Sequence, residues 1–371
     1  MGEKISHIVV CLGMLVFLTV FGTWLLFRTP DPYSASERRV LLTAPKLTAE
    51  TVRSGKFMSD YEDYALDQFP LRDTFRTVKA VNEHYVLRKL DSNKLYLENG
   101  YLSKLEYPLS EAMLDHATDR FAFLYEKFMK EQGITPYLVI VPDKNYFLAG
   151  ESGMLALDYE ALYERVLDRT DFMQYIEIRD LLDIGDYYYT DTHWRQERIT
   201  DVAERILDGM GIPSEKQGIP DRLKNLDIPF EGVYVGQAAL PVKLDAIQYY
   251  DSDVISSCTV LNYDTGMPVE AEVYDIAAAG GRDGYDFFLE GASALITIEN
   301  PNATTDRELV IFRDSFGSSL APLLIAPYKK VTLVDIRYIQ SGMVGSFVKF
   351  EDQDVLFEYS TILLNNSMGM R

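Results

Sequence analysis

The stretch LVIFRDSFG, residues 309–317, joins an apolar run to a polar turn and a glycine. A continuous apolar run of this kind is typical of a parallel strand that is buried on both faces. Residues 317–325 then predict a helix. Ser315 is therefore expected at the carboxyl end of a strand, beside the free backbone N–H groups of a helix start. Such N–H groups are the donors that an oxyanion hole needs.

Strands and helices alternate on both sides of this stretch. The run PYLVIV, residues 136–141, predicts a second buried strand, and Asn99-Gly100 predicts a hairpin. Further strands are expected at 175–178, 330–336 and 357–364, and helices at 110–132, 159–168 and 199–210. Residues 213–305 lose the alternation and predict an insert or a β-rich subdomain. The fold class is therefore α/β, a parallel sheet flanked by helices and interrupted by the insert.

An uncharged segment precedes all of these elements. Residues 8–27, IVVCLGMLVFLTVFGTWLLF, would span about 30 Å as a helix, which is the thickness of a hydrocarbon core. Bulky residues end the run where a signal peptide would carry small ones at a cleavage site. We therefore expect one uncleaved transmembrane helix, with the soluble part held outside the cytoplasm at the cell membrane. Basic residues flank both ends of the run, so charge alone does not decide the orientation.

The expected organisation has three parts. Residues 1–36 form a membrane anchor and a proline-containing stalk, and residues 37–104 form a helical and hairpin region packed on the main domain. Residues 105–371 form the α/β domain, with the insert at about 213–305.

Composition excludes several classes of function. The 371 residues carry 36 Lys and Arg against 57 Asp and Glu, a formal charge of −21, which repels nucleic acid. Of the two cysteines, one lies in the apolar segment, so a disulfide scaffold and a cysteine-based zinc site are excluded. The sequence shows no cluster of metal ligands, and we expect no metal and no cofactor.

A second polar segment, YTDTHW at residues 189–194, supplies partners for Ser315. Asp191 and His193 are two residues apart, so a loop can bring the carboxylate to one imidazole nitrogen and leave the other as a general base. A nucleophilic serine needs such a base and an orienting acid. The spacing alone leaves alternatives open, because D-x-H also occurs in metal sites and on polar surfaces, and a serine after a strand is often a helix cap.

The two segments together resemble a known family. YTDTHW at 189–194, followed by IFRDSFGSSL at 311–320, is similar to the DHHW family of Gram-positive surface proteins, which resembles the SGNH-like domains of the alginate O-acetylation machinery. The likeness extends over nearly the whole soluble chain, with supporting matches at residues 67–73, 141–145, 297–303 and 364–367. Thr192 stands at the second position of the D-H-H-W signature, and Arg313 replaces the glycine of a Gly-Asp-Ser motif.

This resemblance implies an SGNH-like fold and a mechanism. Ser315 would be the nucleophile, His193 the base and Asp191 its orienter. Acetyl would pass through acetyl-Ser315 to a hydroxyl of a surface polysaccharide, or to water in an acetylesterase. Members of this type are anchored by one helix, and a polytopic membrane O-acyltransferase delivers their acetyl group. The competing hypothesis is a non-catalytic envelope protein on the same fold, which binds glycan or a membrane partner.

Other residues are weaker candidates for substrate binding. Lys144 and Asn145 follow a predicted central strand and would line the cleft, although a solvated strand end would look the same. Tyr189 and Trp194 would stack on sugar rings, although aromatics at this density are more often core, and Arg313 adjoins the nucleophile. Because the chain is strongly acidic and its basic residues are scattered, we expect a neutral or weakly charged polysaccharide as the acceptor.

Overall fold

The computed structural model describes residues 2–371, with side chains from residue 5 onward. The chain divides into two compact units. One comprises the residues up to Asn93 together with Val235–Pro241, and the other comprises Lys94–Tyr234 and Val242–Arg371. The three sequence segments predicted above, with boundaries after residues 36 and 104, stay a prediction beside this division.

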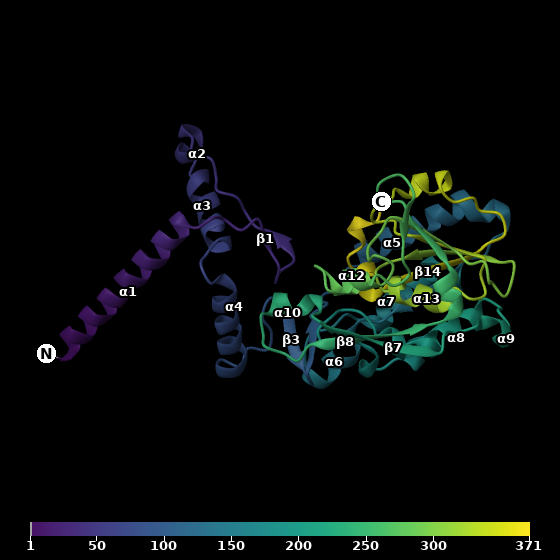
Figure 1. Cartoon of the computed structure of the whole chain (residues 1–371), viewed down its shortest axis with the longest axis horizontal. Helices are drawn as coiled ribbons and strands as arrows, with labels where there is room; N and C mark the ends of the chain where they lie inside the picture. The colour runs from purple at the N-terminus through teal and green to yellow at the C-terminus, as the bar shows by residue number, and fades with distance from the viewer. Residues whose placement is uncertain (1) are drawn as a thin grey trace. The chain divides into compact units, whose positions relative to one another are not determined.

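The larger unit is built on an eight-stranded sheet, in the order β10-β9-β11-β13-β12-β14-β5-β6. Strand β14 of this sheet is labelled in Figure 1. Five neighbouring strands are parallel: β13 (Lys330–Val334), β12 (Glu308–Arg313), β14 (Asp354–Ser360), β5 (Tyr137–Val141) and β6 (Gln174–Tyr175). The other three are antiparallel: β11 (Leu295–Glu299), β9 (Thr259–Asn262) and β10 (Val269–Ala271). This mostly parallel sheet with flanking helices confirms the predicted α/β class.

The side chains of β12 show why the sheet needs cover on both faces. Leu309 and Ile311 point into one apolar cluster, which includes α8 (Thr200–Gly209) and α13 (Gly317–Leu324). Val310 and Phe312 point into the opposite cluster, with residues of α5 (Glu111–Leu124) and α7 (Tyr159–Arg169). Successive strand residues face opposite sides, so an unbroken apolar run is buried only between two helical layers.

Several predicted elements end where local hydrogen bonding changes. The helix predicted over 110–132 runs as α5, then as π-helix η2 (Tyr125–Met129) and 3₁₀-helix η3 (Lys130–Gln132), and stops at Gly133 in the left-handed conformation. The strand predicted over 357–364 ends at Ser360, because the Ser360 hydroxyl caps the short helix α14 (Thr361–Leu364). The Asn99-Gly100 hairpin is confirmed by β3 (Leu95–Glu98) and β4 (Tyr101–Lys104).

The predicted β-rich insert has two parts. Strands β9, β10 and β11 extend the central sheet, so this part is continuous with the main domain and is no separate subdomain. Strands β7 (Arg222–Phe230) and β8 (Asp245–Asp251) form a hairpin of their own, above a small aromatic core. The remaining short helices of the larger unit and of its connections are α6 (Lys144–Ser152), α9 (Ser214–Gln217), α10 (Val233–Ala238), α11 (Asp253–Ser257) and α12 (Ile276–Ala279).

The smaller unit begins with α1 (Gly2–Phe27), in which Ile5–Phe27 is long and apolar enough to cross a membrane. This length and composition fit both an anchor and a signal sequence. The unit continues with the two-residue strands β1 (Tyr33–Ser34) and β2 (Arg39–Val40), followed by α2 (Ala49–Arg53), α3 (Lys56–Asp67), α4 (Arg72–Val81) and π-helix η1 (Asn82–Val86).

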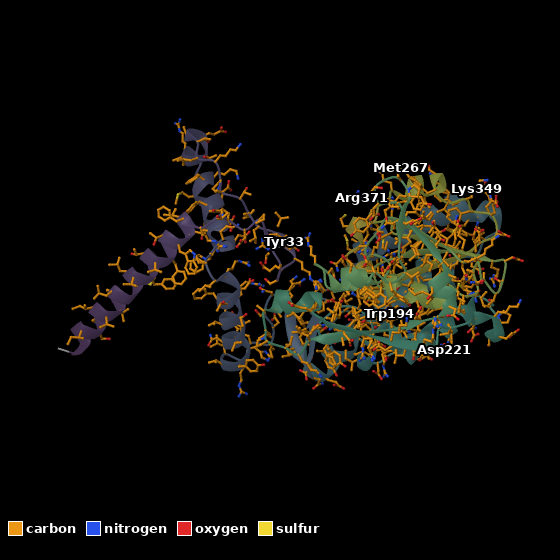
Figure 2. All side chains as sticks on the ribbon, in the orientation of Figure 1. Tyr33, Trp194, Asp221, Met267, Lys349 and Arg371 are labelled. Atoms are coloured by element: carbon orange, nitrogen blue, oxygen red, sulfur yellow. The ribbon has the colours of Figure 1, made fainter. Side chains whose placement is uncertain are left out.

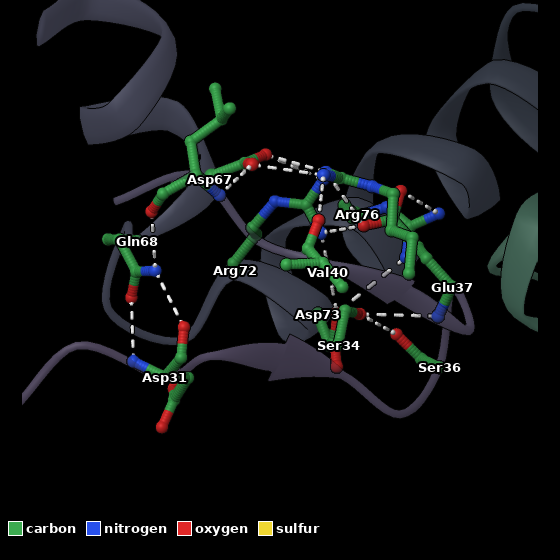
Figure 3. Close-up of polar contacts among 12 residues, drawn as sticks. Asp31, Ser34, Ser36, Glu37, Val40, Asp67, Gln68, Arg72, Asp73 and Arg76 are labelled. Atoms are coloured by element: carbon green, nitrogen blue, oxygen red, sulfur yellow. Dashed lines mark hydrogen bonds and ion pairs between the residues drawn. The ribbon is translucent and has the colours of Figure 1, made fainter. Parts of the chain in front are cut away.

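Polar side chains join the elements of the smaller unit (Figure 3). The Glu37 carboxylate pairs with Arg72 and with Arg76, so it ties the β1–β2 turn to α4. The Arg39 guanidinium donates to both oxygens of Asp67, at 2.5 and 2.9 Å. These ion pairs hold the segment after α1 against α3 and α4.

Candidate active site

Ser315 lies in the turn between β12 and α13, as its position after the apolar run predicts. The neighbouring Asp314 carboxylate fixes this turn. It accepts the backbone N–H of Phe316 at 2.9 Å, and it accepts the N–H and hydroxyl of Ser360 at 2.8 and 2.6 Å. Ser315 is half-buried, and its own backbone N–H has no hydrogen-bond partner among residues 2–371.

His193 is carried by a closed loop. Tyr187 and Trp194 form an antiparallel bridge at the base of the loop, and the N–H of Tyr188 donates to the carbonyl of His193 at 3.1 Å. The Asp245 carboxylate secures the far end of the loop. It accepts the backbone N–H groups of residues 189 and 190 at 2.9 and 2.8 Å, and the Thr190 hydroxyl at 2.6 Å. The loop that carries His193 is therefore held by hydrogen bonds at both of its ends.

The three predicted catalytic residues lie in one hydrogen-bonded line. His193 Nδ1 lies 2.6 Å from Asp191 Oδ1, and His193 Nε2 lies 2.8 Å from Ser315 Oγ. The second carboxylate oxygen of Asp191 accepts the backbone N–H of Val233 at 2.7 Å. An ionised carboxylate can only accept, so Nδ1 carries the proton in this pair and Nε2 is free to accept from the serine hydroxyl.

Aromatic side chains fix the plane of the imidazole. The His193 ring stacks on Tyr285 with 3.7 Å between centroids and 5° between planes, and the Phe316 ring meets it edge-on at 4.9 Å. The Tyr285 hydroxyl and Trp194 Nε1 both donate to Ser319 Oγ, at 2.8 and 2.9 Å. This network ties His193 to α13, the helix that follows Ser315.

The electrostatics favour a charged Asp191. Burial alone would raise the pKa of its carboxyl, which is 1% exposed. The neighbouring His193 and the hydrogen bonds from His193 and Val233 outweigh this effect and hold the pKa of Asp191 well below its usual range. The carboxylate therefore stays ionised and can stabilise an imidazolium when one forms.

Lys144, predicted in the cleft, is buried under the loop that carries the base. Its ammonium donates to the carbonyls of Tyr188 and Tyr189 at 3.0 and 3.3 Å, and it lies 5.2 Å from the centre of the Tyr234 ring. Burial lowers the pKa of Lys144 to about 7, against the opposing attraction of Asp191 and Asp245. These hydrogen bonds indicate that Lys144 stabilises the loop that carries His193.

The other predicted binding residues differ in how far their side chains are exposed. Asn145 and Arg313 are fully buried, and their hydrogen bonds go to protein groups such as the Tyr96 hydroxyl and the Gly291 carbonyl. The structure gives no support to substrate contact by either residue. Trp194 is also fully buried, inside the body of the larger unit (Figure 2), where its ring meets the Phe316 ring edge-on at 5.5 Å. The structure gives no support to stacking of Trp194 on a sugar.

Tyr189 is the predicted aromatic that stays accessible. Its side chain is 40% exposed and stacks on Tyr101 with 4.2 Å between centroids. A partly exposed, supported ring on the loop that carries His193 can offer a flat face to a sugar.

Four residues of the site were not predicted: Asp245, Gly232, Val233 and Tyr285. All four come from the stretch read as an insert, where the sequence pattern gave no expected contacts. Gly232 is required by close approach, since an added Cβ would lie 2.3 Å from the carbonyl of Thr190. The one local signal was Gly232 itself, which lies between the end of β7 and the apolar pair Val233-Tyr234. A glycine in this position does not indicate which residue it contacts.

No cluster of three His, Cys, Asp or Glu side chains that could hold a metal occurs in the described part of the chain. The expectation of no metal and no cofactor stays a prediction.

Solved structures share this fold. A DHHW family protein from Eubacterium siraeum matches over 76% of this chain and 95% of its own, with 18% identity and a TM-score of 0.58. Bacillus cereus PatB1 with a sulfonyl adduct matches over 73% of this chain and 95% of its own, with 19% identity and a TM-score of 0.56. Another PatB1 structure gives 18% identity, coverage of 73% and 96%, and a TM-score of 0.55.

No protein-family model matches the sequence, and no curated protein matches it. The resemblance inferred from the two motifs is confirmed by the solved structures at the level of the fold. This chain has the fold of a DHHW family protein and of PatB1.

Proposed function

We propose that this chain is a membrane-anchored extracytoplasmic O-acetyltransferase, or an acetylesterase, that acts on a cell-surface polysaccharide through acetyl-Ser315. The observation that carries the proposal is the line of contacts from Asp191 through His193 to Ser315, at 2.6 and 2.8 Å. A serine, a base in hydrogen-bond reach and an orienting acid are what acyl transfer needs. The fold shared with PatB1 supports this chemistry, because PatB1 carries a sulfonyl adduct in one structure.

In the first half-reaction, Ser315 Oγ attacks the carbonyl carbon of an acetyl donor, and its proton moves to His193 Nε2. The imidazolium is stabilised by Asp191, and the unpaired N–H of Ser315 is a donor for the developing oxyanion. The tetrahedral intermediate collapses, and the leaving group departs with the proton from His193. Acetyl-Ser315 remains.

In the second half-reaction, a sugar hydroxyl attacks the acetyl carbonyl and gives its proton to His193. Collapse returns this proton to Ser315 Oγ and releases the acetylated sugar. Water in place of the sugar would give acetate, which is the esterase reaction. The accessible ring of Tyr189 supports a sugar acceptor, since aromatic faces bind the apolar faces of sugars.

The proposal also covers the acetyl donor and the cellular location of the protein. The apolar helix α1 supports an anchor in the cell membrane, with the catalytic unit on the extracytoplasmic side. Acetyl groups would reach that side through a polytopic membrane O-acyltransferase, which would serve as the donor partner.

The proposal is tested by turnover of an activated acetyl ester, with and without oligosaccharide acceptors. Wild-type protein should release the alcohol, and acetylated sugar should form when an acceptor is present. Ser315→Ala and His193→Ala should each abolish release, whereas His84→Ala, in the other unit, should not. An inactive wild-type protein that still binds glycan would contradict the proposal in favour of a non-catalytic envelope protein.

A further inference from the structure

Helix α4 and its continuation η1 present apolar side chains on their outward face. Leu71, Phe75 and Val78 recur at helical spacing, and Tyr85 and Val86 extend the row. All are exposed, Val78 at 61% and Val86 at 69%. Surface helices normally expose polar side chains on this face and bury the apolar ones.

The opposite face of the same helix is the one that packs on the protein. Ala80 is buried, and the guanidinium groups of Arg72 and Arg76 pair with Glu37 (Figure 3). Arg76 also donates to the Gly236 carbonyl at 2.7 Å. The polar contacts of α4 with Glu37 and Gly236 therefore lie on the face opposite the apolar row.

Ring contacts join this row to the apolar helix α1. The Phe75 ring lies 5.7 Å from the Phe21 ring and 6.5 Å from the Phe17 ring, centre to centre, and Phe69 stacks on Phe21 at 5.3 Å. Phe21 is six residues before the end of α1 at Phe27. At 1.5 Å per residue, that is about 9 Å below the end of the apolar segment. This depth matches that of interfacial helices, which lie about 5–10 Å into the headgroup–acyl boundary.

The local charge also suits a membrane surface. Residues 72–89 hold five basic and two acidic residues, in a chain whose overall charge is −21. Three of the five basic residues are in ion pairs, Arg72 and Arg76 with Glu37 and Lys89 with Glu83. Lys79 and Arg88 are exposed, so they are the basic residues that this stretch offers to lipid. Apolar side chains flanked by basic ones are the pattern of helices that lie on anionic lipid.

We propose that α4 and η1 lie in the plane of the extracytoplasmic leaflet, with Phe75, Val78 and Val86 toward the acyl chains. The lipid surface is the partner of this face. The inference rests on the proposed anchoring, because it takes α1 to be the transmembrane helix. It adds a second membrane contact, which would hold the smaller unit flat against the bilayer.

Spin labels on the full-length chain test the proposal. Cys11 and Cys258 are first replaced by alanine, and single cysteines are introduced as Val78→Cys, Asp73→Cys and Val16→Cys. The proteins are reconstituted in vesicles of phosphatidylglycerol and phosphatidylethanolamine. Collisions of each nitroxide with oxygen, which is enriched in lipid, are compared with collisions with a water-soluble nickel chelate.

The expected result is a label at Val78 that favours oxygen several-fold over the nickel chelate, as the label at Val16 does. The label at Asp73, about 140° around the helix from Val78, should favour nickel. A label at Val16 that is in lipid, together with a label at Val78 that is in water, would overturn this inference alone. The apolar row of α4 and η1 would then face a protein partner. A label at Val16 in water would instead overturn the anchoring on which it rests.

Discussion

His193 has a different partner for each ring nitrogen, and this difference sets its chemistry. Nδ1 faces the buried carboxylate of Asp191, and Nε2 faces the hydroxyl of Ser315. Stacking on Tyr285 prevents the ring from turning between these partners. For the proposed acyl transfer, this arrangement would let the proton move without reorganisation of the site.

Asp191→Asn tests the orienting role. The amide can present its NH₂ to Nδ1, which would place the ring proton on Nε2 and remove the base for Ser315. We expect kcat to fall by about 10²–10⁴-fold. The thermal midpoint should fall as well, because the amide loses the charge-assisted hydrogen bonds that hold the pKa of Asp191 low. Steady-state kinetics and thermal unfolding measure the two quantities. Asp180→Asn, at an exposed ion pair with Arg205, is the control and should leave both unchanged. Near-normal kcat in Asp191→Asn would remove Asp191 from the mechanism.

Lys144→Met tests the buried amine. The pKa of Lys144 is about 7 in the folded protein, against an ordinary 10.5. Between these values the unfolded chain holds a proton that the folded chain has released, so the free energy of unfolding of wild-type protein rises with pH. The contribution of this group is at most about 1.4 kcal/mol per pH unit. Lys144→Met removes this pH-dependent contribution to the free energy of unfolding. Wild-type protein should therefore gain stability relative to the variant as pH rises above about 7.

Urea unfolding in detergent across this pH range measures the difference for Lys144→Met. Lys349→Met, at an exposed position, is the matched control and should show no such trend. A difference between wild type and Lys144→Met that stays constant with pH would show that the amine is not perturbed. Because Tyr188 and Tyr189 lose their donor, kcat should also fall in the variant at every pH.

The sequence predicts the reacting atoms of the site better than their surroundings. Asp191 and His193 are two residues apart and Ser315 follows an apolar run, so local patterns mark all three as candidates. Their roles were assigned by the resemblance to the DHHW family. Tyr285 and Asp245 reach them through the fold of the insert, which no periodicity describes. Lys144 was predicted in the cleft from its place after β5, but its burial follows from the loop above it.

Two turns position the site at the level of elements. The turn after β12 is tied to β14 through Asp314 and Ser360, and the loop of residues 187–194 is tied to β8 through Asp245. Both turns are held by carboxylates that accept several N–H and O–H groups, Asp314 being buried and Asp245 half-buried. Such fully satisfied networks fix one geometry, because any alternative leaves buried polar groups without partners.

Gly232→Ala tests the support of the base loop by the segment before α10. The new Cβ would lie 2.3 Å from the Thr190 carbonyl carbon and 2.4 Å from the Asp191 backbone nitrogen. The loop must move, and we expect a loss of about 1–3 kcal/mol in the free energy of unfolding together with a lower kcat. Chemical unfolding and ester turnover report both quantities. Gly280→Ala, with Ile228 Cδ1 4.0 Å from the new Cβ, should be close to neutral. Equal effects of the two variants would refute this role for Gly232.

The elements that were well predicted have strong local signals. Apolar runs predicted β5, β12 and β13, and the Asn-Gly pair predicted the β3–β4 hairpin. The ends of β6 and β14 were predicted too late in the chain, at residues 178 and 364, and β14 also begins earlier than predicted, at Asp354. The ends of strands are set by tertiary hydrogen bonds such as those of Ser360. The pairing of β9, β10 and β11 with the central sheet depends on partners distant in sequence, which a single sequence does not reveal.

Charge dominates the behaviour of the whole molecule toward polymers. With a net charge of −21, the protein repels extended polyanions, which meet many of its carboxylates at once. We therefore expect acetyl transfer to neutral oligosaccharides to exceed transfer to uronate-rich ones. Product formation on both acceptors, compared over a salt series, measures this preference. Faster transfer to the uronate acceptor that weakens as salt rises would disprove it, because only a cationic groove gives that dependence.

The central claim is that Ser315 carries the acetyl group. Intact-mass measurement after incubation with an activated acetyl ester tests it most directly. Wild-type protein should gain the mass of one acetyl group on the peptide that contains Ser315, and both Ser315→Ala and His193→Ala should gain none. An acetyl group that persists in Ser315→Ala, or a wild-type protein that gains none while it remains folded, would contradict the account.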